Sequence, residues 1–145
     1  MQILRATPEF TPPEVIVAEE VMDAFLEDPL GSVYHIVVAT VDSTVMGYSV
    51  YGATPLTDGT WDLYWIAVDK KAQGLGLGKA LLTFTEEKVK EAKCRMLLIE
   101  TSGKPGYEKT EAFYRSQGYL EICRIADFYA PGDDKLIFQK LFKRG

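Results

Sequence analysis

The sequence predicts an α/β fold with a mixed, mostly antiparallel sheet flanked by helices. Apolar runs at 34–41, 45–51 and 61–68 are separated by breaks too short for a crossover helix, which predicts antiparallel hairpins. Segments near 79–93 and 109–117 instead show the helical spacing of apolar residues and interrupt the later strands. With 145 residues, of which 47% are hydrophobic, the chain can bury one core, so we expect a single domain over 1–145.

The N-terminal part of the chain predicts a short strand followed by a helix. Met1–Arg5 would form the strand, and Thr11 stands as the N-cap of a helix with Pro12 in its first position. Glu14, three residues after Thr11, is the matching capping-box partner. The stretch 29–31 (PLG) would end this helix. Its buried face would consist of Val15, Val21, Met22, Phe25 and Leu26.

The remaining elements are three strands, a helix, a strand, a second helix and two final strands. The first of these helices would keep Glu86 on its exposed, charged face, and Gly118 would end the second helix. Residues 126–134 (ADFYAPGDD) would form the loop between the last two strands. The buried stripe of the first of these helices would be Leu81, Leu82, Thr85, Val89 and Ala92. The predicted bounds are Tyr34–Val41, Val45–Tyr51, Trp61–Val68, Lys79–Lys93, Arg95–Glu100, Lys109–Gln117, Tyr119–Ile125 and Lys135–Phe142.

The charge and the cysteine content exclude several classes of function. A formal net charge of −5 without a basic block argues against nucleic acid as the main partner. Cys94 and Cys123, each placed in an apparent strand, lack CxxC spacing, so we expect buried thiols and neither a metal site nor a disulfide. The start of the chain lacks a signal-peptide pattern, and no apolar run approaches the roughly 20 residues that a membrane span needs. We therefore expect a cytoplasmic protein without membrane contact.

A glycine-rich stretch, residues 72–82 (AQGLGLGKALL), lies between a predicted strand and a predicted helix. A phosphate-binding P-loop would need glycine and a hydroxyl residue where the chain has Gln73 and Ala80. A dinucleotide-binding fingerprint would need its third glycine where the chain has Lys79 or Leu81. Both patterns fail, so nucleotide binding by this loop is not expected.

The stretch does fit the pattern Q-x-x-G-x-G through Gln73, Gly76 and Gly78. Successive backbone N–H groups in such a turn form a concavity that binds anions, and the start of a helix adds positive potential. The glycines leave the backbone open to close approach, and Lys79 adds charge. The same glycines could instead serve only tight packing of strand against helix, so this pattern by itself leaves both interpretations open.

A second motif, F-Y-x-x-x-G-F/Y, lies downstream in residues 113–119 (FYRSQGY). Together with Q-x-x-G-x-G and the element order along nearly the whole chain, it resembles the GNAT superfamily of acyl-CoA-dependent N-acetyltransferases. The resemblance implies the single-domain acyl-CoA N-acyltransferase fold and direct transfer of an acetyl group from acetyl-CoA to a primary amine in a ternary complex, without a metal. The acceptor stays open among small metabolites, amino acids and proteins.

The resemblance also implies which residues bind the coenzyme A part of acetyl-CoA. The glycine turn would wrap the diphosphate of the cofactor. The backbone of Ile66, Ala67 and Val68 would pair with the pantetheine arm, provided that their strand splays from the next one. The turn residues are Gln73, Gly74, Leu75, Gly76, Leu77, Gly78 and Lys79.

Two residues are the catalytic candidates. Tyr114 matches the family tyrosine that protonates the leaving thiolate, with a phenol pKa near ~10, although packing against the sheet is an alternative role. Asp62 lies where some relatives carry a glutamate general base, and side-chain alternation would place it on one strand face with Tyr64 and Ile66. Glu100 is the rival base, and water or prior deprotonation of the amine are further alternatives.

Other interpretations remain beside an N-acetyltransferase. A non-catalytic acyl-CoA-binding sensor or regulatory module would carry the same loop. The aromatic residues near 61–65, or Phe128 and Tyr129 with the aspartates around them, could receive a cationic amine, and both sets also suit structural roles. The single histidine, His35, is expected to be structural or exposed. The resemblance is compatible with a homodimer formed through strands.

Overall fold

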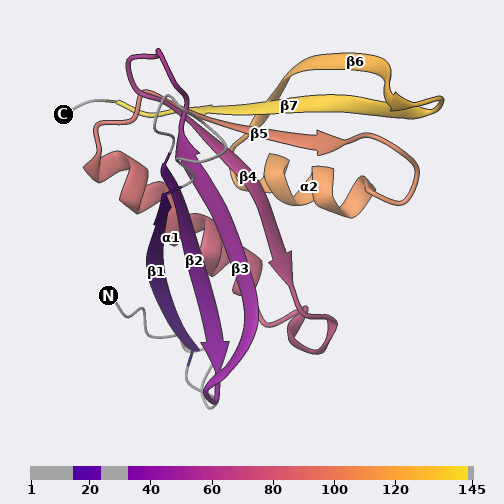
Figure 1. The fold of residues 1–145 in the computed structure, drawn as a ribbon. Helices are drawn as coiled ribbons and strands as arrows, with labels where there is room; N and C mark the ends of the chain where they lie inside the picture. Colours follow the sequence, from indigo (N-terminus) through magenta and orange to yellow (C-terminus); the bar gives the residue numbers. More distant parts are fainter. Residues whose placement is uncertain (1–14, 24–32, 144–145) are drawn as a thin grey trace.

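The computed structural model describes residues 15–23 and 33–143, which form a seven-stranded sheet with two α-helices (Figure 1). The strand order in the sheet is β1-β2-β3-β4-β5-β7-β6. A short 3-10 helix, Lys70–Ala72, follows β4. The bounds are β1 Val15–Asp23, β2 Val33–Val41, β3 Thr44–Ala53, β4 Thr60–Val68, α1 Leu77–Glu91, β5 Met96–Ser102, α2 Glu108–Ser116, β6 Leu120–Ala130 and β7 Asp133–Leu141.

Antiparallel pairing dominates this sheet, as the short breaks in the sequence predicted. Among the described strands only β4 and β5 run parallel, because α1 connects them as a crossover. The β2–β3 hairpin turns at Asp42 and Ser43, whose φ angles of 51° and 66° suit a two-residue turn that follows the strand twist. The prediction of a mixed, mostly antiparallel α/β sheet is confirmed.

The predicted helix after Thr11 is wrong over the part of it that the structure describes. Val15–Asp23 is the strand β1, which pairs antiparallel with β2 along its whole length. β-Branched residues are frequent in this segment and favour extended backbone, and β2 supplies ladder hydrogen bonds that outweigh the local helix-start signal. The predicted strand Met1–Arg5 and both ends of the predicted helix lie outside the described residues.

β4 and β5 separate part-way along their length, which opens the sheet (Figure 1). Their parallel pairing begins with Thr60 opposite Met96 and ends with Leu63 opposite Ile99. β4 continues to Val68, and β3 stays paired with it to that point. Beyond Leu63, the edge of β4 that faces away from β3 has no ladder partner among the described strands.

An irregularity in the β3–β4 pairing changes which side chains of β4 share a face. The register skips Tyr64, since Leu63 and Trp65 pair with consecutive residues of β3. Leu63 belongs to the core, and Ile66, three residues later, packs against the same core. Asp62 therefore lies on the face opposite Ile66, and the predicted shared face of Asp62, Tyr64 and Ile66 is wrong.

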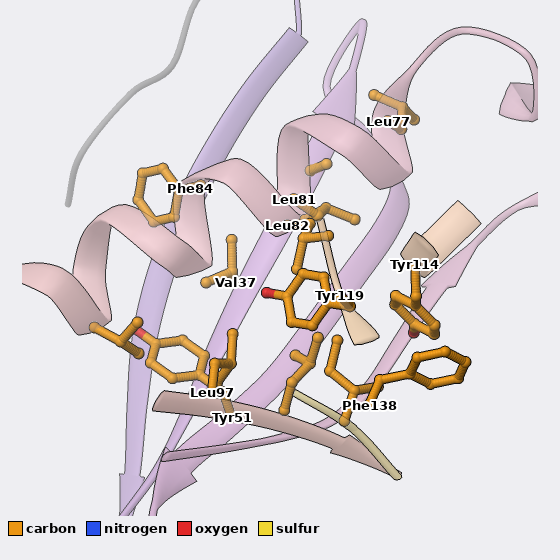
Figure 2. Close-up of a cluster of buried hydrophobic side chains, with 14 of the residues drawn as sticks. Val37, Tyr51, Leu77, Leu81, Leu82, Phe84, Leu97, Tyr114, Tyr119 and Phe138 are labelled. Carbon is orange, nitrogen blue, oxygen red and sulfur yellow. The ribbon is translucent and has the colours of Figure 1, made fainter. Parts of the chain in front are cut away.

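α1 packs across β2, β3 and β4 and lies at the centre of the core (Figure 2). The Thr85 hydroxyl on α1 and the Ser49 hydroxyl on β3, both fully buried, form a hydrogen bond of 3.0 Å. The predicted stripe is confirmed except for Ala92, which is exposed just after the helix. Glu86, predicted to be exposed, is only 9% exposed, because Tyr119 and Lys140 contact its carboxylate. The buried residues of α1 are Leu77, Leu81, Leu82, Phe84, Thr85, Glu86 and Val89.

The predicted loop at 126–134 is mostly strand. β6 extends to Ala130, which pairs with Asp133, so the turn itself consists of two residues, 131 and 132. The ladder is irregular between Ile125 and Ala130, and Asp127 there has a φ of 57°. This bulge leaves Phe128 and Tyr129 about half exposed.

The two cysteines differ from the expectation that both are buried inside strands. Cys94 is buried but lies before β5 rather than inside a strand, and Cys123 on β6 is only half-buried.

Within the described residues, no helix has the length and apolar character to cross a membrane. In the same part of the chain, no three His, Cys, Asp or Glu side chains are grouped so that they could hold a metal ion.

Candidate active site

A cleft of about 530 Å³ lies where β4 leaves β5. Its walls come from the end of β4, from the turn into α1 and from the first turns of α2. The lining residues are Ile66, Val68, Ala72, Gln73, Gly74, Gly76, Leu77, Gly78, Lys79, Lys109, Thr110, Phe113 and Tyr114.

The glycine turn supplies this cleft with backbone N–H groups at the start of α1. Gly76 is the N-cap, and its φ of 80° is a left-handed conformation that glycine adopts without a Cβ clash. The Ala80 N–H donates to the Gly76 carbonyl at 3.0 Å, which is the first hydrogen bond of the helix. The N–H groups of residues 76–79 come before it and have no acceptor within the helix. No side chain caps this helix start. These N–H groups and the helix dipole together form an anion-binding surface.

The earlier part of the turn is already hydrogen-bonded within the protein. The Gln73 N–H donates to the Lys70 carbonyl at 3.4 Å, and the Leu75 N–H donates to the Ala72 carbonyl at 3.3 Å. The anion-binding N–H groups are therefore concentrated at the start of α1 rather than spread along the whole turn.

Two exposed lysines bring positive charge to the cleft, one from each helix. Lys79 belongs to the first turn of α1, and the sequence had indicated it. Lys109 and its neighbour Thr110 lie at the start of α2, and sequence reasoning missed both. Their spacing could have indicated them, because Lys109 and Thr110 precede the motif residues Phe113 and Tyr114 by four positions each and so share their helix face.

Gly78 brings α2 against the start of α1. A Cβ at this position would lie 3.6 Å from Cζ of Phe113, so the two helices approach closely here. The ring of Phe113 contacts that of Tyr114, with centroids 5.4 Å apart. The glycine motif and the F-Y motif, distant in the sequence, therefore form adjoining walls of one cleft.

Tyr114 is 6% exposed and lies among other aromatic rings. Its ring centroid is 6.2 Å from that of Tyr119 and 5.9 Å from that of Phe138. Burial raises the pKa of Tyr114 to about 12. The ordinary phenol pKa expected from the sequence is therefore wrong, and Tyr114 is a hydrogen-bond donor that keeps its proton throughout the neutral range.

Asp62 and Glu100 line a separate cavity of about 390 Å³, together with Leu63, Tyr64 and Trp65. The Thr54 hydroxyl donates a hydrogen bond of 2.5 Å to Oδ2 of Asp62. The two linings contain consecutive residues of β4, Trp65 in this cavity and Ile66 in the cleft. The structure thus brings the two rival bases together and places them on a different cavity from Tyr114.

The β6–β7 hairpin reaches Glu100 on this side of the protein. Oε2 of Glu100 accepts a hydrogen bond of 3.0 Å from the Tyr129 hydroxyl, and Oε1 pairs with Nζ of Lys135 at 2.9 Å. Nζ of Lys135 also lies 4.5 Å from the centre of the Phe128 ring. Partial burial of the ring and the Glu100 carboxylate raise the pKa of Tyr129 to about 12, so this hydroxyl stays protonated.

Comparison with known protein families identifies the family of this chain. The sequence model of the acetyltransferase (GNAT) domain matches residues 32–121, a span that includes β4, the glycine turn and α2. The chain belongs to the GNAT acetyltransferase family.

Individual relatives agree with this assignment. An uncharacterized N-acetyltransferase of Methanocaldococcus jannaschii is 29% identical over 104 residues, which are 71% of this chain and 64% of that protein. The chain thus spans less than two thirds of the length of this curated relative. A proposed GNAT acetyltransferase of Desulfovibrio desulfuricans, with a known crystal structure, is 44% identical and superimposes with a TM-score of 0.73 over 74% of this chain and 68% of its own. A proposed streptothricin acetyltransferase of Bacillus anthracis, solved with acetyl coenzyme A, shares the fold, with a TM-score of 0.69, 20% identity and coverage of 76% and 63%.

Most residues that the GNAT resemblance had selected line the cleft, with two exceptions among the cofactor-binding set. Leu75 is 38% exposed and lies outside the lining. Ala67 lines a different groove, with Met46 and Gly47, because neighbouring side chains on β4 point to opposite faces. The predicted role of Ala67 uses its backbone, which belongs to the splayed part of β4.

Proposed function

We propose that this GNAT chain transfers the acetyl group of acetyl-CoA to a primary amine by direct attack in a ternary complex. The observation that carries the proposal is that β4 loses its pairing with β5 after Leu63, and that the end of β4, the glycine turn and Tyr114 line one cleft. Membership in the GNAT acetyltransferase family supports the reaction class. The acetyl coenzyme A bound to the Bacillus anthracis neighbour supports the choice of co-substrate.

The cleft suits the chemically different parts of acetyl-CoA. The diphosphate would be bound by the N–H groups of residues 76–79 and by the charges of Lys79 and Lys109. The pantetheine amides would add to the edge of β4 beyond Leu63 as a further strand does, with Ile66 as an apolar contact. The lining changes from charged and polar at the turn to apolar along β4, which is the order of diphosphate and pantetheine in the molecule.

The transfer balances with acetyl-CoA, a neutral amine, residues of this chain and water. The amine nitrogen attacks the thioester carbonyl, the C–N bond forms, and negative charge develops on the carbonyl oxygen, for which N–H groups of the splayed β4 edge would be donors. The intermediate collapses, the C–S bond breaks, and the nitrogen loses a proton. The products are the acetylated amine and coenzyme A.

Tyr114 would donate a hydrogen bond to the departing sulfur. Its pKa of about 12 exceeds that of an ordinary thiol, about 8.5, so complete proton transfer to the thiolate would cost about 5 kcal/mol. We therefore give Tyr114 the role of stabilising the thiolate, which then takes its proton from water. This refines the predicted role of Tyr114 as the acid that protonates the leaving group.

The acceptor amine would approach from the cavity of Asp62 and Glu100. Both oxygens of Glu100 are engaged by Tyr129 and Lys135, so Asp62 is the better candidate to take the amine proton, directly or through water. Trp65, 51% exposed, would offer a ring face to a cationic amine. The acetylated product would leave on the same side of β4.

The decisive experiment follows thiol release from acetyl-CoA with a panel of amines, while calorimetry measures acetyl-CoA binding. The panel contains a diamine, free amino acids, a peptide with a free N-terminal alanine and a peptide with an internal lysine. We expect saturable, amine-dependent release with at least one class, and the acetylated product in the mass spectrum. Binding of acetyl-CoA without amine-dependent release would favour a non-catalytic acyl-CoA-binding module, and absence of both binding and release would overturn the proposal.

A further inference from the structure

A buried polar cluster outside the cleft joins α1, β7 and the segment after α2. Glu86 on α1 is only 9% exposed, and Tyr119 is 1% exposed. The Tyr119 hydroxyl donates to Oε2 of Glu86 at 2.7 Å, and Nζ of Lys140 on β7 lies 3.1 Å from the same oxygen. Glu86, Tyr119 and Lys140 are called the Glu86 cluster below.

The Glu86 cluster holds the turn that directly follows Tyr114. Nζ of Lys140 donates to the Gln117 carbonyl at 2.9 Å. The N–H groups of Gln117 and Tyr119 both donate to the Tyr114 carbonyl, each at 3.1 Å. The residue between them is Gly118, with a φ of 94°, and a Cβ there would lie 3.5 Å from Cε of Lys140. The backbone at Tyr114 is therefore tied to Lys140 and Tyr119, and through them to Glu86.

The energetics of this cluster favour a geometric role. The Glu86 side chain is 11% exposed and that of Lys140 is 28% exposed, so the ion pair is largely but not fully buried. Such a pair seldom stabilises a fold more than well-packed apolar residues of the same volume would, because its charges lose much of their hydration. The pair does require one arrangement of its partners, since removing Lys140 leaves the buried Glu86 carboxylate without its cation. Burial and the Glu86 carboxylate also raise the pKa of Tyr119, so its hydroxyl remains the donor in this arrangement.

α1 links the cluster to the cofactor end of the cleft. The helix begins at the glycine turn and carries Glu86 near its middle, and it is a continuous helix from Leu77 to Glu91. The position of Glu86 is therefore set relative to the N–H groups of residues 76–79. On the other side, the aromatic ring of Tyr119 packs against that of Tyr114, with centroids 6.2 Å apart.

We propose that the Glu86 cluster is a positioning device that holds the Tyr114 hydroxyl at a set distance from the start of α1. This inference rests on the proposed function, in which acetyl-CoA spans the space between these two points. Glu86, Tyr119 and Lys140 are positioning residues in this scheme and touch neither the thioester nor the amine.

The first test reads the environment of Tyr114 without any acceptor. Tyrosine labelled with ¹³C at the ε carbons is observed by NMR at pH 7 and pH 10, and Tyr114→Phe assigns the Tyr114 resonance. In the wild type this resonance should stay unchanged at pH 10, because burial holds the pKa of Tyr114 at about 12. The variants Glu86→Gln and Tyr119→Phe should let water reach the ring and begin to ionise it at pH 10. The matched control is Glu87→Gln, which changes an exposed carboxylate next to Glu86 on the same helix.

The second test is a double-mutant cycle on acetyl transfer to the best amine of the panel. Tyr119→Phe should lower kcat about tenfold, with the KM for acetyl-CoA unchanged within about twofold, as a small displacement of a reacting group would. In the Tyr114→Phe background the same change should have no further effect. Circular dichroism confirms that each variant is folded.

Two outcomes would overturn the positioning role. One is a Tyr114 resonance at pH 10 that is the same in Glu86→Gln, Tyr119→Phe and the wild type. The other is an equal loss of kcat from Tyr119→Phe in both backgrounds, which would indicate a general structural effect. If Tyr114→Phe by itself leaves kcat unchanged, the proposed chemical role of Tyr114 fails instead, and the NMR arm still decides whether the cluster positions the ring.

Discussion

Gly78 distinguishes two explanations of the glycine turn, diphosphate binding and tight packing of strand against helix. If the turn binds the diphosphate, substitution of Gly78 by alanine should raise stability and weaken cofactor binding. The position lies in the first turn of α1, its φ is not in the left-handed region, and the nearest atom to an added Cβ is Cζ of Phe113 at 3.6 Å, an ordinary contact. Alanine in a helix is favoured over glycine by about 0.5–1 kcal/mol. Gly78→Ala should therefore raise the free energy of unfolding by up to that amount, or the melting temperature by about 2–3 °C.

The same methyl group would stand among the N–H groups that are proposed to bind the diphosphate. We expect the Kd of Gly78→Ala for acetyl-CoA to rise about tenfold or more, although the protein is more stable. The companion variant Gly76→Ala forces a left-handed φ of 80° on a residue with a Cβ, which costs about 1–2 kcal/mol, so it should lose both stability and binding. Calorimetric titration and thermal unfolding of the two variants measure these effects. A Gly78→Ala protein that binds acetyl-CoA as the wild type does would refute the reasoning, and a loss of stability in that variant would indicate tight packing as the reason for this glycine.

The other predictions concern charge, proton position and pH. Replacing Lys79 and Lys109 together by alanine should weaken acetyl-CoA binding most at low salt, because added salt screens exposed charges in any case, and titrations at two salt concentrations check this. Tyr114→Phe should lower kcat and leave the Kd for acetyl-CoA within about twofold, measured by steady-state kinetics beside calorimetry; a loss of binding instead would make Tyr114 a structural residue. The folded-state pKa of Tyr114, about 12, is above its unfolded value of 10.0, so the folded protein holds this proton to higher pH. It therefore loses up to about 3 kcal/mol of stability as the pH rises from 10 to 12. Urea unfolding at pH 9 and pH 11 should accordingly show a smaller decrease for Tyr114→Phe than for the wild type. Asp62→Asn should reduce kcat more than Glu100→Gln does, and the reverse order would move the role of base to Glu100.

Local patterns in the sequence were sufficient for most of the elements and indicated part of the cleft. Strands β2 to β5, both helices and β7 lie within a few residues of their predicted bounds, because apolar periodicity and glycine positions are local signals. The Q-x-x-G-x-G and F-Y-x-x-x-G-Y motifs indicated two walls of the cleft, and these walls do adjoin at Gly78 and Phe113.

The failures occur where a neighbouring element overrode the local signal. The helix-start residues before Val15 predicted a helix, but pairing with β2 makes the segment a strand. Strict alternation placed Asp62 with Ile66, but an extra residue at Tyr64 puts them on opposite faces.

The amino-acid sequence by itself determined the order of the elements from β2 onward and the glycine turn with its helix start. These depend on backbone freedom and on the spacing of apolar residues, which are properties of short stretches of chain. The family was indicated by the resemblance of the two motifs. Only the tertiary structure decided that β4 leaves β5 after Leu63, that Asp62 and Tyr114 line different cavities, and that Glu86 is buried against Tyr119 and Lys140. Each of these is set by contacts between residues far apart in the chain, where the free energy of pairing and burial outweighs local preference.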